Sequence, residues 1–537
     1  MRTFSSYGPV NCQREFCVKR EALVEQVLEH IIAEPDLSGH YFTIWAPRQS
    51  GKTWIMRQVK DGILAKYGER FLVGTMSVQG VIFMEKEEDN LVEAFLRRIP
   101  LLIWETFKID IDIPDGWESF KNIFERDKGI FNKPVILFID EFDSLPPVVI
   151  DKFVTMFRDI YLKRESYFLH GLALIGVRSV LGVESMRGSP FNVQRSVNIP
   201  NFTKDEVFEL FHQYREESGQ GIEIDVIEKV YEVTRGQPGL VCWFGELITE
   251  KYNPGKGTVI NAANFKDIYR RALMVEWNNT ILNLTKKAKV NYKEYVMNIF
   301  ANPNVPFIIE KDWCNYLYMN GIIDSKKGVD EFGEEIEICF FSSPFVQEKL
   351  YESLAYDIVG DRLPILALDI LDDLADVLEG EGINLPALLR RYKDYLFRLR
   401  AKGLNPWKEQ PRRADLNYRE AVGHFHLYAW LQSALGQRGV VSPEFPTGNG
   451  KVDLHVKYIK SDKSIVDGII EVKSFTNAND IKDNIAQAVG YAKKLNKDSV
   501  TIALFVPSID EKVVEQFQIE KVIEGVKANV VPIGWAI

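Results

Sequence analysis

One octapeptide constrains the fold of this chain more than any other feature: Ala46-Pro47-Arg48-Gln49-Ser50-Gly51-Lys52-Thr53. It follows an apolar run, 41–46, typical of a buried strand, and precedes a helical pattern over 52–66. Backbone N–H groups of such a loop cradle phosphate oxygens, and all eight residues are candidates for binding a nucleotide. Lys52 is expected to reach the β- and γ-phosphates, and the Thr53 hydroxyl to coordinate Mg²⁺. Ala46 replaces the usual first glycine, which is a mild change if its φ is negative.

A second apolar run, 135–140, ends in the acids that such a loop requires. Asp140 is expected to hold Mg²⁺ through water, and Glu141 to polarise the attacking water. Further runs at 71–78 and 172–177 are apolar on both faces and are separated by helical segments. Strands of this kind are typical of a parallel sheet covered by helices on both sides. The sequence therefore predicts an α/β domain that binds and hydrolyses ATP with Mg²⁺.

The motifs APRQSGKT and FIDEFD, followed by SPFNVQRSVNIPNFTKDEV and TRGQPGL, resemble the AAA-like ATPases of prokaryotes, which are relatives of AAA+ and STAND NTPases. The resemblance covers about residues 10–355. It implies that Arg178, after the fourth core strand, senses the γ-phosphate, although a plain surface arginine fits equally well. It also implies that Pro238, in a Gly-Gln-Pro element, places a lid helix against the nucleotide; a simple turn is the alternative. Arg195 could act on the nucleotide of a neighbouring copy in a homo-oligomer.

From about residue 200 the pattern becomes helical, and five domains are expected. Thr203 is a predicted N-cap, with Glu206 three residues later as a capping box. The segment 285–355 has the helix, charged turn and strand of a small winged helix. The expected parts are an AAA-like ATPase core (1–200), a helical lid (201–284), a winged-helix-like domain (285–359), a helical basic connector (360–414) and a second α/β domain (415–537).

The last α/β domain carries acidic and basic side chains on two expected strands. Asp453 lies in an alternating strand, 451–458, and Glu471 and Lys473 lie two residues apart in the next strand. The period of two in a strand puts these two side chains on one face. Two carboxylates and an ammonium make a poor core, but Asp453 and Glu471 suit Mg²⁺ or Mn²⁺. Lys473 would then orient or deprotonate the water that attacks a phosphodiester.

This pattern resembles the PD-(D/E)XK nuclease superfamily over about residues 415–510, which have a restriction-endonuclease-like fold. The resemblance implies that Glu420 is the N-terminal acidic residue of the site. It also implies that Gln487 and Tyr491, which share a helix face at i and i+4, point at the metal or the scissile phosphate of DNA. Val452 stands where the superfamily pattern has proline. A metal-free, degenerate domain that only binds nucleic acid or protein is the alternative.

The net charge of −10, from 66 basic and 76 acidic residues, gives DNA no general attraction to this chain. Any DNA contact requires a local basic patch, and residues 390–413 contain nine Lys/Arg against two Asp/Glu. A solvated helix whose aromatic side chains pack inward is the alternative. The candidate phosphate contacts are Arg390, Arg391, Arg398, Arg400, Arg412 and Arg413.

The five cysteines form no CxxC pair and no zinc pattern with histidine, and their odd number suggests a reducing compartment. No apolar run is long enough to span a membrane, so the cytoplasm is the expected location. Together these features predict an ATPase that controls a metal-dependent nuclease acting on DNA, in prokaryotic defence or mobile-element handling. The alternative is a STAND-like regulatory ATPase with an inactive C-terminal binding module. The sequence identifies no protein trigger.

Overall fold

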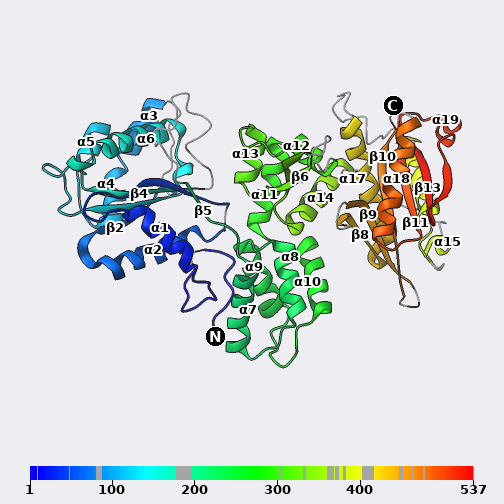
Figure 1. The fold of residues 1–537 in the computed structure, drawn as a ribbon, viewed down its shortest axis with the longest axis horizontal. Helices are drawn as coiled ribbons and strands as arrows, with labels where there is room; N and C mark the ends of the chain where they lie inside the picture. The colour runs from blue at the N-terminus through cyan, green and yellow to red at the C-terminus, as the bar shows by residue number, and fades with distance from the viewer. Residues whose placement is uncertain are drawn as a thin grey trace. The chain divides into compact units, whose positions relative to one another are not determined.

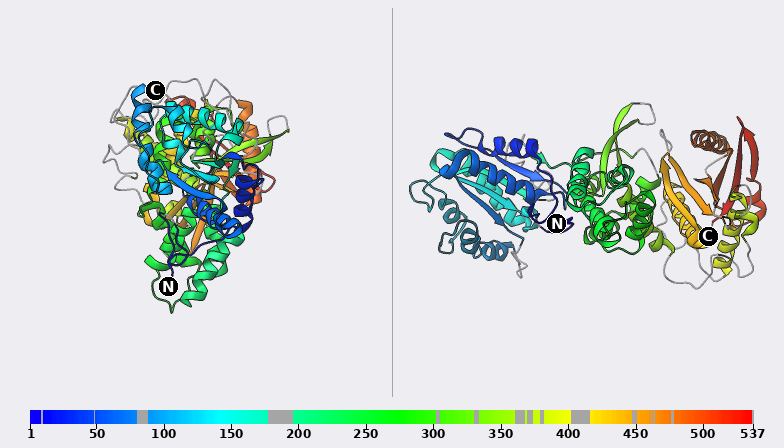
Figure 2. Two further views of the ribbon diagram at one scale, coloured as in Figure 1. Left: turned by 90° about the vertical axis from the view of Figure 1, so that its left-hand side faces the viewer. Right: turned by 90° about the horizontal axis from the view of Figure 1, so that it is seen from below.

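The computed structural model describes the whole chain except residues 9, 48, 80–87, 177–195, 302–304, 330–333, 360–367, 369–373, 379–381, 402–415, 447–450, 461, 463, 476–477 and 536–537. It contains two compact units (Figures 1 and 2). The first comprises Met1–Thr280, Ile308–Asp324 and Phe341–Phe345. The second comprises Ile281–Phe307, Ser325–Phe340 and Val346–Ile537, so the expected winged-helix segment contributes to both units.

The first unit is built on a parallel five-stranded sheet in the order β2-β3-β4-β1-β5. Its strands are β1 (Tyr41–Trp45), β2 (Leu72–Ser77), β3 (Val135–Asp140), β4 (Leu169–Gly176) and β5 (Ser196–Asn198). The four expected strands are confirmed. β5 has no detectable pattern in the sequence, because a three-residue strand with only Val197 buried is too short to show a period.

Helices cover both faces of this sheet, as the two-faced apolar strands predict (Figure 1). On β3, Ile136 and Phe138 face the core that α1 (Glu21–Ile32) and α2 (Lys52–Tyr67) share with the sheet. Leu137 and Ile139 face the opposite core. That second core is closed by α3 (Glu88–Leu96), α4 (Ile99–Phe107), α5 (Trp117–Asn122) and α6 (Pro147–Leu162).

Helices follow the sheet, as expected from residue 200 onward. They are α7 (Lys204–Ser218), α8 (Ile224–Thr234), α9 (Pro238–Gly245), a π-helical segment (Glu246–Lys251) and α10 (Ala262–Met274). The predicted capping box is confirmed, since the Thr203 hydroxyl accepts the Glu206 N–H at 3.2 Å and the Glu206 carboxylate accepts the Thr203 N–H at 2.8 Å. Further along, α13 (Asp312–Met319) leads into a hairpin of β6 (Ile323–Val329) and β7 (Glu335–Phe341).

The second unit contains a six-stranded mixed sheet in the order β12-β13-β11-β10-β9-β8. The predicted elements are present as β8 (Gly439–Pro446), β9 (Lys451–Ile459), β10 (Ile465–Ser474), α18 (Ala478–Lys494) and β11 (Ser499–Val506). Not expected were α19 (Glu511–Glu515), β12 (Ile519–Ile523) and β13 (Val526–Gly534). The strands β8, β9 and β10 form an antiparallel meander, and β11 adds in parallel to β10.

Helices also cover both faces of the second sheet. On one face α18 contributes Ile485 and Val489 to a hydrophobic core that also contains Ile469 and Ile502. On the other face α17 (Leu416–Leu435) passes so close to β11 that a Cβ on Gly423 would lie 2.8 Å from the Phe505 ring. The other described helices of this unit are α12 (Lys293–Ala301), α15 (Ala375–Leu378) and α16 (Leu385–Ala401). Two helices, α11 (Asn279–Asn291) and α14 (Pro344–Val359), begin in the first unit and continue into the second.

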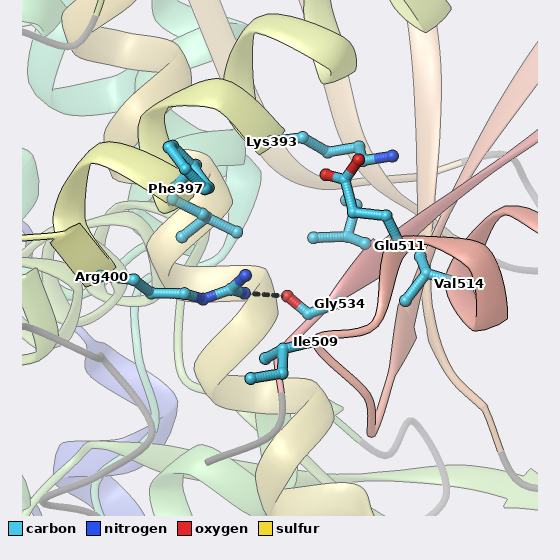
Figure 3. A pocket seen from close by; sticks show the side chains of 9 residues that line it. Lys393, Phe397, Arg400, Ile509, Glu511, Val514 and Gly534 are labelled. Atoms are coloured by element: carbon cyan, nitrogen blue, oxygen red, sulfur yellow. Dashed lines mark hydrogen bonds between the residues drawn. The ribbon is translucent and has the colours of Figure 1, made fainter.

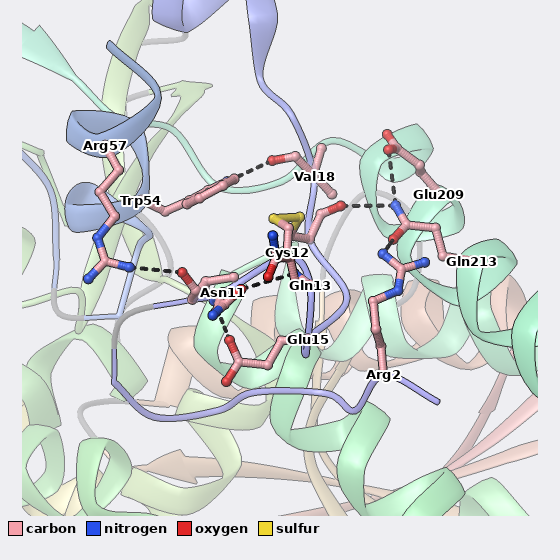
Figure 4. The surroundings of a disulfide bond; sticks show 12 residues. Arg2, Asn11, Cys12, Gln13, Glu15, Val18, Trp54, Arg57, Glu209 and Gln213 are labelled. Atoms are coloured by element: carbon pink, nitrogen blue, oxygen red, sulfur yellow. Dashed lines mark hydrogen bonds between the residues drawn. A yellow bond between two sulfur atoms is a disulfide. The ribbon is translucent and has the colours of Figure 1, made fainter. Parts of the chain in front are cut away.

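Two cysteines are paired, which the sequence analysis did not predict. Cys12 and Cys17 form a disulfide in the segment before α1 (Figure 4). Cys242, Cys314 and Cys339 are free and buried. The pair could not be predicted from the sequence, because the number of cysteines is odd and neither residue lies in a recognisable spacing motif. Within the described ranges, no helix is both long and apolar enough to cross a membrane.

Candidate functional site

The phosphate-binding octapeptide connects β1 to α2, as predicted. Gly51 is the N-cap of α2 with φ 86°, a left-handed conformation that favours glycine. Gln49 also has a positive φ, 57°, whereas Ala46 does not, so the missing first glycine is tolerated as expected. The Ser50 hydroxyl donates to the Pro47 carbonyl at 2.8 Å and closes the turn.

Lys52 lies inside this turn and is only 8% exposed. Its Nζ donates to the carbonyl oxygens of Ala46 at 2.9 Å and Pro47 at 2.8 Å. The ammonium is therefore held by the loop that is expected to bind phosphate. Burial raises the pKa of Asp140, and the Lys52 charge opposes that rise, so the two sequence motifs lie in one site.

Asp140 ends β3 and is partly buried beside the octapeptide. Burial is the largest influence and raises the pKa of its carboxyl. Three groups oppose that shift: the Glu141 N–H, which donates to Asp140 Oδ1 at 2.9 Å, the Lys52 charge, and the Thr53 hydroxyl through a hydrogen bond. A buried carboxylate beside a threonine hydroxyl offers the hard oxygen ligands that Mg²⁺ prefers. Thr53 and Asp140 therefore fit the predicted metal position.

The two candidate bases lie next to each other after β3. Glu141 is half-buried and has φ 57°, a left-handed conformation that turns the chain directly after Asp140. Asp143 lies over the end of β4, since a Cβ on Gly176 would be 2.5 Å from its Oδ1. Asp143 is therefore held beside β4, the strand that lies between β1 and β3 in the sheet. The role of Glu141 as the base stays a prediction.

The first turn of α9 touches the octapeptide. Gly236 has φ 71° and no space for a side chain, because a Cβ there would lie 2.0 Å from the Phe202 carbonyl oxygen. Pro238 then starts α9, and the Gly239 N–H donates to the Gln49 carbonyl at 3.0 Å. A Cβ on Gly239 would lie 2.5 Å from Gln49 Oε1. The Gly-Gln-Pro element thus starts a helix that packs on the phosphate-binding loop, which a simple turn would not do.

The segment before α1 joins α2 to α7, which the sequence analysis missed (Figure 4). From α2, Trp54 Nε1 donates to the Val18 carbonyl at 3.0 Å, and Arg57 donates to the Val10 carbonyl at 3.1 Å. From α7, Gln213 Nε2 donates to the Cys17 carbonyl at 2.9 Å. All three bonds use backbone carbonyls of the segment, so no side-chain pattern in the sequence could reveal them.

Six predicted site residues lie partly or wholly outside the part of the chain that the structure describes. Glu420 lies in α17, and the structure describes its backbone but not its side chain. The predicted residues outside the described part of the chain are Arg48, Arg178, Arg195, Arg412 and Arg413.

The C-terminal acidic and basic residues meet on one face of the second sheet, as their spacing predicts. In the antiparallel register of β9 and β10, Leu454 opposes Ile470, which brings the next pair, Asp453 and Glu471, together. Asp453 Oδ2 accepts the Val472 N–H at 2.7 Å. Lys473 Nζ lies 3.7 Å from Asp453 Oδ2 and 3.5 Å from Glu471 Oε2.

Glu471 is the most buried member of this cluster, with 1% of its surface exposed. Burial, then the charge of Asp453, raises the pKa of its carboxyl well above the usual range, and Lys473 opposes the shift. Its Oε1 is buried without a hydrogen-bond partner among the described residues, which is costly for a carboxylate oxygen. A cation would supply that partner and reduce the repulsion between the two carboxylates.

The protein ligands for such a cation are few. In the part of the chain that the structure describes, no group of three or more His, Cys, Asp or Glu is placed to hold a metal. Asp453 and Glu471 fit Mg²⁺ or Mn²⁺ if water or a phosphate completes the ligand set, as is usual for Mg²⁺. On α18, Gln487 Nε2 donates to the Tyr491 hydroxyl at 2.9 Å, so these two side chains share a helix face as predicted.

The basic helix α16 is partly structural. Arg391 pairs with Asp376 at 3.1 Å. Arg400 is half-buried and donates to the Gly534 carbonyl in a shallow pocket beside Lys393 and Glu511 (Figure 3). Burial lowers the pKa of Arg400. The Arg400 guanidinium thus ties α16 to β13, and its contact with DNA stays a prediction.

Two other arginines of α16 stay candidates for DNA contact. Arg390 is exposed, and the Arg398 guanidinium lies over the Tyr395 ring at 5.8 Å. Tyr392 and Tyr395 are buried, as the solvated-helix alternative expects, whereas Phe397 is 68% exposed.

The parallel sheet, the loop after β1 and the acidic end of β3 define a P-loop ATPase domain. Residues 5–298 match the family of the AAA-like domain, and the chain belongs to that family. No curated protein matches this chain.

Three solved structures are similar to it at low identity. A Walker-type ATPase of Pyrococcus abyssi has 15% identity and a TM-score of 0.43, over 65% of this chain and 99% of the other. Cdc6p of Pyrobaculum aerophilum has 14% identity and a TM-score of 0.36, over 65% of this chain and 98% of the other. The RuvB Holliday junction branch migration motor of Thermotoga maritima has 13% identity and a TM-score of 0.33, over 65% of this chain and 96% of the other. At these scores the similarities assign no activity or partner to this chain.

Proposed function

We propose that this protein is an ATP-hydrolysing enzyme whose AAA-like domain controls a metal-dependent nuclease that acts on DNA. The observation that supports the nuclease is the buried, unpartnered Glu471 Oε1 beside Asp453 and Lys473. Such a protein would be cytoplasmic, could form homo-oligomers through its ATPase domain, and would suit prokaryotic defence or mobile-element handling. The last role is an analogy with other fused ATPases.

In the ATPase domain, Lys52 and the backbone of the octapeptide bind the phosphates of ATP. Thr53 and Asp140 hold Mg²⁺, which neutralises charge that develops on the phosphates. Glu141 orients the attacking water and takes up its proton.

In the nuclease, Asp453 and Glu471 would hold Mg²⁺ or Mn²⁺, and such an ion would supply Lewis-acid polarisation of a phosphodiester and a lower pKa for bound water. Lys473, which contacts both carboxylates, would orient the attacking water through its ammonium, and only its neutral amine form would accept the proton of that water. Glu420 contributes a further carboxylate, and Gln487 with Tyr491 lies against the phosphate backbone of the DNA. The exposed Arg390 and the neighbouring Arg398 contribute positive charge to DNA binding.

Control by ATP has a physical route through α9 and α14. The N-terminus of α9 contacts Gln49 of the phosphate-binding loop. In the same helix, the rings of Trp243 and Phe244 pack on Phe345 with centroid distances of 5.7 and 5.3 Å. Phe345 belongs to the first turn of α14, and α14 continues into the second unit. A nucleotide-dependent movement of α9 would therefore act on α14.

The test is incubation of the full-length protein with plasmid, linear and single-stranded DNA, with and without Mn²⁺ and ATP. Asp453→Ala should abolish cleavage and leave ATP hydrolysis intact, and Lys473→Ala should reduce cleavage strongly but keep Mn²⁺ binding. Asp467→Asn is the matched control, because Asp467 is 26% exposed against 27% for Asp453 and lies in β10. If the wild type neither binds Mn²⁺ nor cleaves DNA, or if Asp453→Ala cleaves as well as the wild type, there is no nuclease.

A second function is favoured by the position of Lys473. Its ammonium lies within 4 Å of both carboxylates, at 3.7 and 3.5 Å, and so neutralises part of their charge without a metal. This arrangement suits a STAND-like regulatory ATPase whose C-terminal domain binds nucleic acid or protein without cleaving. DNA binding without cleavage, together with a change in sedimentation on adding ATP, would support this function over the nuclease.

A further inference from the structure

A buried histidine contacts the backbone of the candidate metal ligand Asp453. His424, in α17, is 5% exposed, and its Nε2 lies 3.2 Å from the Asp453 carbonyl oxygen. A carbonyl can only accept, so Nε2 must carry the proton of the ring. The other ring nitrogen, Nδ1, is then an acceptor. The Tyr351 hydroxyl lies 3.2 Å from Nδ1 and 3.4 Å from the His424 carbonyl oxygen, and both of these atoms can only accept. Tyr351 therefore donates to His424, and His424 donates to Asp453.

Tyr351 is fully buried and held on several sides by aromatic rings. It belongs to α14, which precedes the predicted nuclease-like domain (415–537) in the sequence. The ring centroids of Phe425 and Tyr428 lie 4.5 Å from that of Tyr351, and the centroid of Phe300 lies at 5.3 Å. Because these rings restrict the Tyr351 ring, its hydroxyl has a fixed direction toward His424.

Asp453 is thus anchored at both ends. The histidine holds its carbonyl oxygen, and the Val472 N–H holds its carboxylate Oδ2 at 2.7 Å. A carboxylate that must share a cation with Glu471 gains from such anchoring, because metal sites lose affinity when the groups behind their ligands are removed.

We propose that Tyr351 and His424 are positioning residues that hold Asp453 in place for the divalent cation, so that the metal site depends on α14. This inference rests on the proposed nuclease function. It also gives a role in metal binding to α14, which lies in the segment predicted as a winged-helix-like domain.

The structure offers a matched control in a second buried tyrosine–histidine pair. The Tyr392 hydroxyl of α16 lies 2.7 Å from Nδ1 of His426, two residues after His424 in α17. Both members are buried, with Tyr392 at 0% and His426 at 2% exposure. Tyr392→Phe and Tyr351→Phe each remove one hydroxyl from the same kind of buried pair on the same helix.

The experiment measures Mn²⁺ binding by calorimetry and the Mn²⁺ concentration that half-saturates DNA cleavage, using full-length protein. Tyr351→Phe and His424→Phe should weaken Mn²⁺ binding about tenfold, with a smaller effect on cleavage at saturating Mn²⁺. His424→Gln, whose amide N–H₂ can replace the Nε2 donor, should restore part of the affinity. Tyr392→Phe should stay within about twofold of the wild type. Thermal unfolding and ATP hydrolysis of each variant check that it is folded.

Two outcomes would overturn the inference alone: Asp453→Ala loses Mn²⁺ while Tyr351→Phe binds it like the wild type, or Tyr351→Phe and Tyr392→Phe weaken binding equally. Equal effects would mean that the Tyr351 hydroxyl only stabilises the fold. If His424→Phe does not fold, Tyr351→Phe still tests the positioning role, because it removes a single oxygen atom and leaves the packing of the ring in place. A wild type that binds no Mn²⁺ would instead overturn the nuclease function and this inference together.

Discussion

The contact between α9 and the phosphate-binding loop can be tested by adding one methyl group. Gly239→Ala places a Cβ 2.5 Å from Gln49 Oε1 and 2.7 Å from Gln49 Cβ, both far inside van der Waals contact. Gln49 cannot simply rotate away, because its own Cβ is one of the two contacts. The backbone of the loop or of α9 must therefore move, which strains the hydrogen bond of 3.0 Å between the Gly239 N–H and the Gln49 carbonyl.

Overpacking of this kind costs roughly 1–3 kcal/mol. If the strain displaces the phosphate-binding loop, the Kd for ATP should rise by about five- to 150-fold, since about 1.4 kcal/mol corresponds to a factor of ten. If the strain is instead relieved by moving α9 alone, the Kd should change little and the free energy of unfolding should fall. Titration with a fluorescent ATP analogue, together with urea denaturation, separates the two results.

Gln49→Gly provides the control, because it removes both atoms that the new methyl group meets. Gln49 has φ 57°, where glycine is at least as favourable as any other residue. The double variant Gly239→Ala with Gln49→Gly should bind ATP within about threefold of Gln49→Gly alone, as expected when two changes are coupled. The reasoning is refuted if Gly239→Ala has wild-type affinity and stability, or if Gln49→Gly does not rescue it.

Three further predictions concern single residues. Lys52→Ala should weaken ATP binding by about tenfold or more, roughly 1.4 kcal/mol, and unchanged binding of the fluorescent analogue would contradict the role of its ammonium. Glu141→Gln should bind ATP but hydrolyse it about 100-fold more slowly, and wild-type turnover would point to Asp143 as the base. His426 is buried, and burial lowers its pKa from 6.5 to about 3, so its contribution to stability is present above pH 6.5 and is lost as the pH falls toward 3. Between pH 6.5 and 5 the loss should be about 2 kcal/mol. His426→Gln should remove that part of the pH dependence in urea denaturation, and an unchanged slope would contradict it.

The local parts of both sites could be predicted from the sequence. The octapeptide that ends in Lys52 and Thr53 forms a loop between a strand and a helix, so its position in the fold could be predicted from its residues and their neighbours. The strand that ends in Asp140 is apolar on both faces, which only a sheet with two layers of helices can bury. Glu471 and Lys473 share a face because side chains alternate along a strand.

Which distant residues meet follows from the tertiary structure alone. The order of the sheet brings Asp140 beside Thr53, and the hydrogen bonds of the Cys12–Cys17 segment reach two helices through backbone carbonyls. The contacts from Tyr351 through His424 to Asp453 join three elements that no motif or period connects. Periodicity reports which face of an element is apolar, but the same apolar face can pack on many partners. The partner is selected by the shape and chemistry of the assembled core, which a single sequence does not display.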